Sequence, residues 1–280
     1  MTATLRPIPD APALLLRSGA GIRPAALVVA DLHLGLGGTR DAPGGPPEAS
    51  AERLATDLID LAAERDARRL LVAGDVKHPI VGTPPSLRPV VFDFFARILA
   101  QGIGVDLVLG NHDVGLLPYL PREVRVHSQS GVVREGVGFF HGHCWPSDAV
   151  LRAPKLVTGH LHPGFRFAPT PDLPDGKRRC WVRVEFAPGA LELGRPTRKK
   201  GRTRTEPREL IVLPAFNPLA GTESLNRERP RRGRSFLFQR FLGRGVARAY
   251  LLDGTDVGRI VTDPATPGPR RGVSRARPGR

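Results

Sequence analysis

The sequence predicts a mixed α/β protein with two β-sheets, which we expect to stack as a four-layer α/β/β/α sandwich. In the first half of the chain, short apolar runs typical of strands buried on both faces alternate with longer segments of helical periodicity. The second half holds more strand-like runs and fewer helical ones. With 280 residues, of which 40% are hydrophobic, the chain can bury a sizeable core.

Five buried strands are predicted from apolar runs that each end in a polar cluster. They span residues 26–30, 70–73, 105–109, 137–140 and 155–158.

Two helices are predicted between the first three of these runs. In residues 50–69 leucines recur at helical spacing, and Ser50 is the expected N-cap. Residues 88–101 carry one apolar stripe that includes Phe94 and Phe95. Strands that alternate with helices in this way indicate a parallel sheet with right-handed crossovers.

The second half adds four strand-like runs without clear helices between them. They are residues 181–186, 209–213, 247–252 and 257–261. Asp253-Gly254 separates the last two runs and predicts a hairpin turn.

The formal charge of +15 is concentrated in three segments rich in Arg, Pro and Gly. We expect one domain over residues 1–262, with a basic, disordered loop at 194–208 and an Arg-rich segment at 227–244. A basic, disordered tail follows at 263–280. Such segments hold too few apolar residues to offset the entropy of ordering. The rest of the chain is nearly neutral.

These basic segments have two interpretations. They are either solvated loops and a tail, or a surface that contacts nucleic-acid phosphates and releases counterions. Aromatic residues able to stack on bases are sparse there, apart from Phe236, Phe238 and Phe241.

Cysteine content and hydropathy bear on the compartment. Cys144 and Cys180 form no disulfide framework or zinc cluster, which suits a reducing compartment. The sequence has no apolar run long enough to span a membrane and no secretory signal pattern at its start. We therefore expect a cytoplasmic protein without a membrane partner.

Residues able to hold metal or phosphate follow each of the five buried strands. They are Asp31-Leu32-His33, Gly74-Asp75, Gly110-Asn111-His112-Asp113, His141-Gly142-His143 and Gly159-His160-Leu161-His162. Because open α/β sheets bind ligands beyond the carboxyl ends of their strands, we expect these groups to converge. Carboxylate, imidazole and amide donors without thiolate suit Mn²⁺, Fe, Zn²⁺ or a mixed pair.

A pair of metal ions needs a shared carboxylate, and Asp75 is the natural bridge. The joint charge of two ions lowers the pKa of a bridging water, which supplies hydroxide near neutral pH. Glycines at 74, 110 and 159 let the backbone turn sharply and let a phosphate approach.

The order of these motifs resembles that of the calcineurin-like metallophosphoesterases, and the resemblance spans residues 28–162. It implies two divalent ions, with Mn²⁺ as the first choice. The implied ligands of the first ion are Asp31, His33, His162 and the bridging Asp75. Those implied for the second ion are Asp75, Asn111, His141 and His160. The resemblance further implies that His112 is the general acid or charge stabiliser, oriented by Asp113.

Within that superfamily, four segments look like the small archaeal-type phosphoesterases akin to DNA-ligase-associated bacterial enzymes, some of which are DNA-repair nucleases. These segments are residues 74–78, 141–146, 159–163 and 213–219. His78, His143 and Asn217 are candidate substrate-binding residues. For His78 a capping or packing role is the alternative, and for Asn217 the alternative is a turn.

The sequence therefore supports a metal-dependent phosphoesterase that hydrolyses a phosphodiester by a metal-bridging hydroxide, with a nuclease acting on DNA or RNA as the first hypothesis. The alternative is an enzyme for nucleotides or other small phosphate esters. A third hypothesis is a noncatalytic metal-binding scaffold on the same fold.

Overall fold

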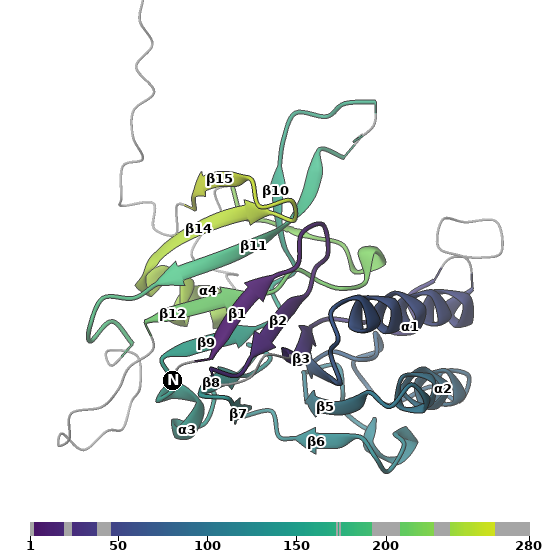
Figure 1. Ribbon diagram of the computed structural model, residues 1–280. Helices are drawn as coiled ribbons and strands as arrows, with labels where there is room; N and C mark the ends of the chain where they lie inside the picture. The colour runs from purple at the N-terminus through teal and green to yellow at the C-terminus, as the bar shows by residue number, and fades with distance from the viewer. Residues whose placement is uncertain are drawn as a thin grey trace, which may run out of the picture.

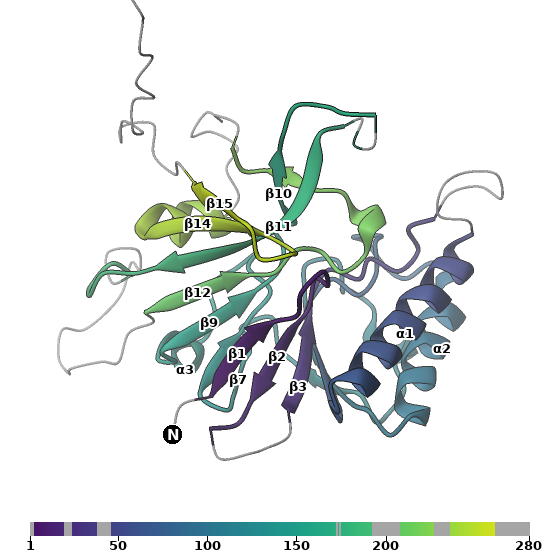
Figure 2. The same ribbon diagram turned by 45° about the horizontal axis from the view of Figure 1, so that its top comes forward.

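The computed structural model describes residues 3–19, 24–37, 46–171, 173, 175–191, 208–226 and 236–260. Two β-sheets lie face to face, and α1 and α2 lie side by side on one flank (Figures 1 and 2).

The first sheet has the strand order β1-β2-β3-β4-β5-β6. Its strands are β1 (Thr4–Pro7), β2 (Leu14–Arg17), β3 (Pro24–Val29), β4 (Arg69–Ala73), β5 (Gly104–Val108) and β6 (Arg125–His127). The pairs β1/β2 and β2/β3 are antiparallel, and β3 to β6 run parallel. The predicted parallel sheet with helical crossovers is thus present, extended by an antiparallel pair at one edge.

The second sheet has the order β13-β10-β11-β12-β9-β8-β7, and β14 pairs with both β11 and β15. Its strands are β7 (Val132–Arg134), β8 (Val137–Phe139), β9 (Lys155–Thr158), β10 (Pro163–Arg166), β11 (Lys177–Glu185), β12 (Glu209–Val212), β13 (Glu223–Ser224), β14 (Val246–Leu251) and β15 (Asp256–Arg259). It is mixed, because β8, β9 and β12 run parallel while β11 is antiparallel to β10, β12 and β14. The hairpin predicted at Asp253-Gly254 joins β14 to β15.

The described helices are four α-helices and three short 3₁₀ turns: α1 (Pro47–Glu64), α2 (Leu87–Ala100), α3 (Asp148–Leu151), α4 (Phe236–Arg240), η1 (Leu117–Tyr119), η3 (Pro218–Ala220) and η4 (Leu242–Arg244). Within the described ranges, no helix combines the length and the apolar character that crossing a bilayer requires.

Three apolar clusters hold the layers together. One joins α1 and α2 to the first sheet and includes Leu58, Phe94 and Val72. A second fills the space between the sheets; its members are Leu14, Leu16, Val28, Val108, Phe139, Val157, Trp181, Ile211 and Leu213, among others. The third joins α4 and η4 to the outer face of the second sheet. The predicted four-layer α/β/β/α order is confirmed.

Three details of the prediction are wrong. Helix α1 begins at Pro47, so Ser50 is a buried residue of its first turn and not the N-cap; proline is favoured at this position because its missing N–H has no helical partner there. The same helix ends at Glu64 rather than at residue 69. The Arg-rich segment 227–244 is ordered over 236–244, where Leu237 and Phe241 are fully buried.

Burial also removes Phe241 as a base-stacking residue, because its ring packs against Phe140 and Trp145. Residues 194–207, 227–235 and 261–280 lie outside the described residues, so the expectations about the basic loop, the start of the Arg-rich segment and the tail stay predictions.

A buried carboxylate links the two sheets. Asp106 of β5 bonds to Arg69 of β4 and His127 of β6 in its own sheet, and to Arg134 of β7 in the other. The His127 Nε2 and Arg134 Nη2 atoms lie 2.7 and 3.0 Å from Asp106 Oδ1. Burial alone would raise the pKa of Asp106, but these hydrogen bonds lower it to about 2.

We predict that Asp106→Asn destabilises the fold at neutral pH and flattens its acid sensitivity. Because the pKa of Asp106 is lower in the folded state, its contribution of about 2 kcal/mol is present above pH 4 and is lost as the pH falls towards 2. Urea unfolding across this range should show the wild-type and variant free energies converging. A difference that does not change with pH would contradict this account.

Candidate metal centre

The polar clusters predicted after the buried strands gather at one edge of the sandwich. Asp31, Asp75, Asn111, His141 and His160 each lie within three residues of the end of β3, β4, β5, β8 and β9 respectively. The two sheets meet directly here, because the His160 N–H donates to Asp31 Oδ2 at 3.0 Å. Side chains from both sheets therefore face a common point.

The backbone at this edge takes a conformation that non-glycine residues rarely adopt. Asp31, Asp75 and His160 have φ of 59°, 55° and 71°, and His33 and His162 also have positive φ. Paired backbone hydrogen bonds hold the turns: the Asp31 N–H donates to the Gly74 carbonyl at 3.0 Å, and the His33 N–H to the Asp75 carbonyl at 2.9 Å. Such strain persists where the surroundings fix the chain, and it clusters at functional sites.

Two glycines are required by close packing against these carboxylates. A Cβ on Gly110 would overlap the Asp75 carboxylate and its backbone nitrogen. A Cβ on Gly159 would lie 2.7 Å from Asp31 Oδ2 and 2.6 Å from the Ala30 Cβ. The absence of a side chain at both positions is what lets the acids from neighbouring strands reach the same point.

The first donor group consists of Asp31, His33 and His162, whose ligand atoms all lie within 4.8 Å of one another. The His33 and His162 Nε2 atoms are 3.1 Å apart, and His162 Nε2 is 3.4 Å from Asp31 Oδ1. Asp75 Oδ2 lies 3.8 Å from His33 Nε2, so this carboxylate borders the group.

The second donor group consists of Asp75, His141 and His160. Asp75 Oδ2 is 3.1 Å from His141 Nε2, which is 3.2 Å from Asn111 Oδ1. The other ring nitrogen of His141 faces the Ala73 carbonyl at 2.9 Å. A proton on that Nδ1 leaves the Nε2 lone pair directed at the site, which is how a metal-binding histidine is usually fixed.

The titration of these groups reflects a site built for positive charge. Burial lowers the pKa of both His33 and His160 to about 4, so both rings are neutral, with free lone pairs, at pH 7. Burial would also lower the pKa of His141, but Asp75 and Asp31 raise it to about 9. The buried carboxylates thus draw a proton to the place where a cation would lie.

The donors fit a pair of divalent cations. Ligands at about 2.0–2.2 Å from one ion lie roughly 3 to 3.5 Å from each other, which is the spacing of several atom pairs in both groups. Every donor is an imidazole nitrogen, a carboxylate or an amide oxygen, as suits Mn²⁺, Fe or Zn²⁺. Asp75 borders both groups, as a bridging ligand must.

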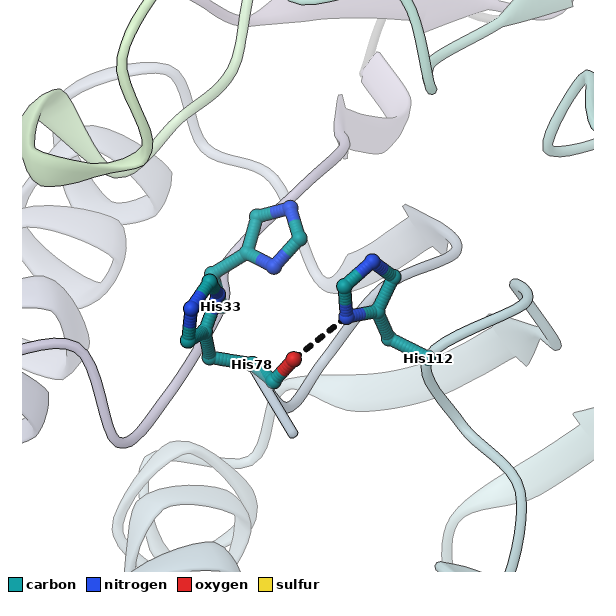
Figure 3. A group of neighbouring side chains, drawn as sticks. All are labelled: His33, His78 and His112. Carbon is teal, nitrogen blue, oxygen red and sulfur yellow. Dashed lines mark hydrogen bonds between the residues drawn. The ribbon is translucent and has the colours of Figure 1, made fainter. Parts of the chain in front are cut away.

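His112 and His78 lie beside the first donor group (Figure 3). The His112 and His78 rings are stacked with centroids 5.9 Å apart, and the His33 ring is edge-on to both. The Nδ1 atom of His112 contacts the His78 carbonyl oxygen, and its Nε2 lies 3.8 Å from Asp75 Oδ2. The imidazole of His112 thus adjoins the carboxylate that borders both donor groups.

Asp113, expected to orient His112, bonds to backbone groups of two loops. Its carboxylate accepts the backbone N–H groups of Asp75, Val76 and Gly110 at 2.8 to 3.0 Å. Both oxygens of Asp113 thus bond to the backbone, while the His112 ring contacts the carbonyl of His78. Asp113 ties the loop after β5 to the loop after β4.

Asn217, a candidate substrate-binding residue, is also bonded to the backbone. The side chain is 1% exposed, its amide nitrogen donates to the Leu32 carbonyl at 2.8 Å, and its oxygen accepts the Leu219 N–H at 2.9 Å. With both ends bonded to the backbone, it caps η3 and holds the loop that carries Asp31 and His33, which is the turn role given as the alternative to substrate binding.

His143, the third substrate-binding candidate, borders the second donor group. Its ring centroid is 5.4 Å from that of His141 and 6.2 Å from that of His160. Its Nε2 lies 3.3 Å from Gln129 Oε1, and its Nδ1 is buried without a hydrogen-bond partner. Sequence reasoning missed Gln129, which lies between β6 and β7 and belongs to no motif.

Comparison with solved structures gives the fold. The crystal structure of Pseudomonas putida nuclease MPE matches with a TM-score of 0.50 at 20% identity, over 89% of this chain and 98% of that one. YfcE, a phosphoesterase from E. coli, matches with a TM-score of 0.37 at 14% identity, over 85% of this chain and 99% of that one. No protein-family model and no curated protein matches the sequence. The first likeness shows that this two-sheet α/β fold is shared with the structure of that nuclease.

We predict that Gly110→Ala lowers the number of Mn²⁺ ions retained per chain, because the added methyl group displaces Asp75. Gly104→Ala is the matched control: it lies at the other end of β5, where a Cβ would meet its nearest atom, Arg69 Nη1, at 3.4 Å. Elemental analysis after dialysis against Mn²⁺ measures the content. Equal metal content in the two variants would refute the close-packing argument.

Proposed function

We propose that this protein is a phosphoesterase that depends on two divalent metal ions and hydrolyses a phosphodiester. The observation that carries the proposal is the pair of three-residue donor groups, drawn from both sheets, that meet at the Asp75 carboxylate. A purely structural metal site would need neither a carboxylate shared between two donor groups, as Asp75 is, nor an additional imidazole beside it, as His112 is.

Asp31, His33 and His162 would hold one ion, Asn111, His141 and His160 the other, and Asp75 would be shared by both. Mn²⁺ is the first choice, with Fe, Zn²⁺ or a mixed pair as alternatives. When bound, the two ions would supply hydroxide by lowering the pKa of a water molecule, and would offset the charge of the phosphoryl oxygens.

His112 is proposed as the general acid for the leaving oxygen. The contact of Nδ1 with the His78 carbonyl fixes the orientation of the ring. The Nε2–H then remains free to donate to the leaving oxygen. His78 and His143 border the two ends of the site and are proposed to contact the substrate.

A nuclease is the first choice among phosphodiesterases. The solved structure with a TM-score of 0.50 is a nuclease, and the predicted basic segments would supply phosphate contacts. We also propose that the chain belongs to the DNA-ligase-associated group of calcineurin-like enzymes. Its residues 1–262 would form one domain. We place it in the cytoplasm, since both cysteines are free thiols.

We predict that Asp75→Asn abolishes Mn²⁺-dependent hydrolysis of bis-p-nitrophenyl phosphate. The neutral amide removes the shared negative charge on which both ions depend. His112→Ala should lower the rate with an alkyl diester by 10²- to 10⁴-fold, and less with p-nitrophenyl esters, whose leaving group needs no proton. Full turnover by Asp75→Asn would end the proposal.

The basic segments separate a nuclease from an enzyme of small esters. We predict that deleting 195–208 together with the tail from 263 weakens single-stranded DNA binding and lowers the slope of its salt dependence, because fewer counterions are released. Turnover of a nucleotide diester should stay the same. If binding and slope are unchanged, the small-ester alternative is favoured.

A further inference from the structure

Four large aliphatic side chains lie exposed in two loops beside the imidazoles of His78 and His112. Val81 is 88% exposed, Ile80 57%, Val114 55% and Leu117 53%. We call these four residues the aliphatic rim. Among the described residues, seven large hydrophobic side chains are exposed, and the four most exposed of them form the rim. Such clustering marks a binding surface more than chance exposure does.

The two loops that carry the rim are packed together. The Thr83 hydroxyl donates to the Gly115 carbonyl at 2.9 Å, and a Cβ on Gly115 would lie 3.5 Å from the Gly82 Cα. The contact between His112 Nδ1 and the His78 carbonyl joins the same loops at their other ends. The rim therefore forms one surface that continues from the proposed general acid.

The chemistry of this surface is uncharged. Residues 79–86 and 114–121 contain no Asp or Glu, so no carboxylate there repels a phosphate chain. At the edge of the surface, the Arg88 guanidinium lies 4.9 Å from the centroid of the Tyr119 ring. The rim thus offers apolar contact, bordered by a cation, next to a site that takes a phosphate.

We propose that the aliphatic rim receives the sugar and base of the nucleotide on the leaving side of the scissile phosphate, in a single-stranded nucleic acid. This inference rests on the proposed function. A substrate whose leaving oxygen faces His112 must continue across the adjoining loops. The faces of its bases are open to apolar contact in a single strand and stacked against one another in a duplex.

A protein partner is the other class of occupant for an apolar surface. A partner seated on the rim would cover His112 and block access to the donor groups, whereas a nucleotide seated there is part of the reacting molecule. The position of the rim beside the general acid therefore favours the substrate.

The test compares Val81→Ser and Val114→Ser with Phe92→Ser, which removes an apolar side chain of similar exposure, 48%, from α2. The substrates are a labelled single-stranded oligonucleotide and bis-p-nitrophenyl phosphate, both with Mn²⁺. We expect each rim variant to raise the KM for the oligonucleotide about three- to tenfold. This fold-change should be at least three times the fold-change in the KM for the small diester. The salt slope should not change, because no phosphate contact is lost. Phe92→Ser should behave as wild type, and Val81→Leu should retain the wild-type KM.

The outcomes separate the two proposals. If wild-type protein with Mn²⁺ hydrolyses neither substrate, the proposed function fails and this inference fails with it. If wild-type protein cleaves both but the rim variants keep its oligonucleotide KM, the inference alone is overturned and the rim is a surface for another partner. Equal losses with both substrates would also overturn it, because they would indicate a disturbed site rather than a lost contact.

Discussion

The structure depends on bringing two acids from neighbouring strands to one point, against their mutual repulsion. Asp31 and Asp75 are both buried, and each is held by backbone N–H groups: His160 N–H at Asp31 and His112 N–H at Asp75. Left-handed turns aim the acids inward, at a cost of about 1–2 kcal/mol per residue. The ladder bonds that continue past β3 and β4 offset this cost, since the strained residues are still paired with a neighbouring strand.

Burial then determines what the site can bind. Water cannot screen the two carboxylates, so the neighbouring imidazoles or a cation must balance them. His141 has no exposed surface, and its pKa of about 9 means that the ring is protonated at neutral pH. His33 and His160, whose pKa values are about 4, are neutral there. The negative charge of the carboxylates would hold metal ions, and the positive charge of the bound ions would in turn attract a phosphate.

The parts of the fold that sequence reasoning recovered are those set by burial on both faces. Strands β3, β4, β5, β8 and β9 coincide with nearly continuous apolar runs in the sequence, and the motifs follow their ends. The antiparallel edge strands β1 and β2 were missed because β1 is largely exposed and β2 is a short run close to the start of the chain. Strands of two or three residues, such as β7 and β13, hold too little pattern to detect.

At the site, residue types were predictable but hydrogen-bond partners were not. Asp113 was expected to act on its neighbour His112, yet its carboxylate bonds to backbone groups, two of them in the loop after β4. Because these partners lie 37 or 38 residues away in the sequence, the spacing of neighbouring residues does not reveal them. Gln129 beside His143 is hidden for the same reason, because contacts between loops depend on how the sheets stack.

The hydrogen bonds made by Asn217 set a lower limit on the length of chain needed to form the site. The last of the five motifs ends at His162. The loop that bears Asp31 and His33 is nevertheless held by Asn217, which donates to the Leu32 carbonyl from 185 residues further along the chain. Phe216 bonds to the Ala30 carbonyl, and Arg179 in turn holds the Phe216 carbonyl. A fragment that ended at His162 would keep all five motifs but would lack these contacts. The loop that carries Asp31 and His33 would then lose the hydrogen bonds that fix its conformation.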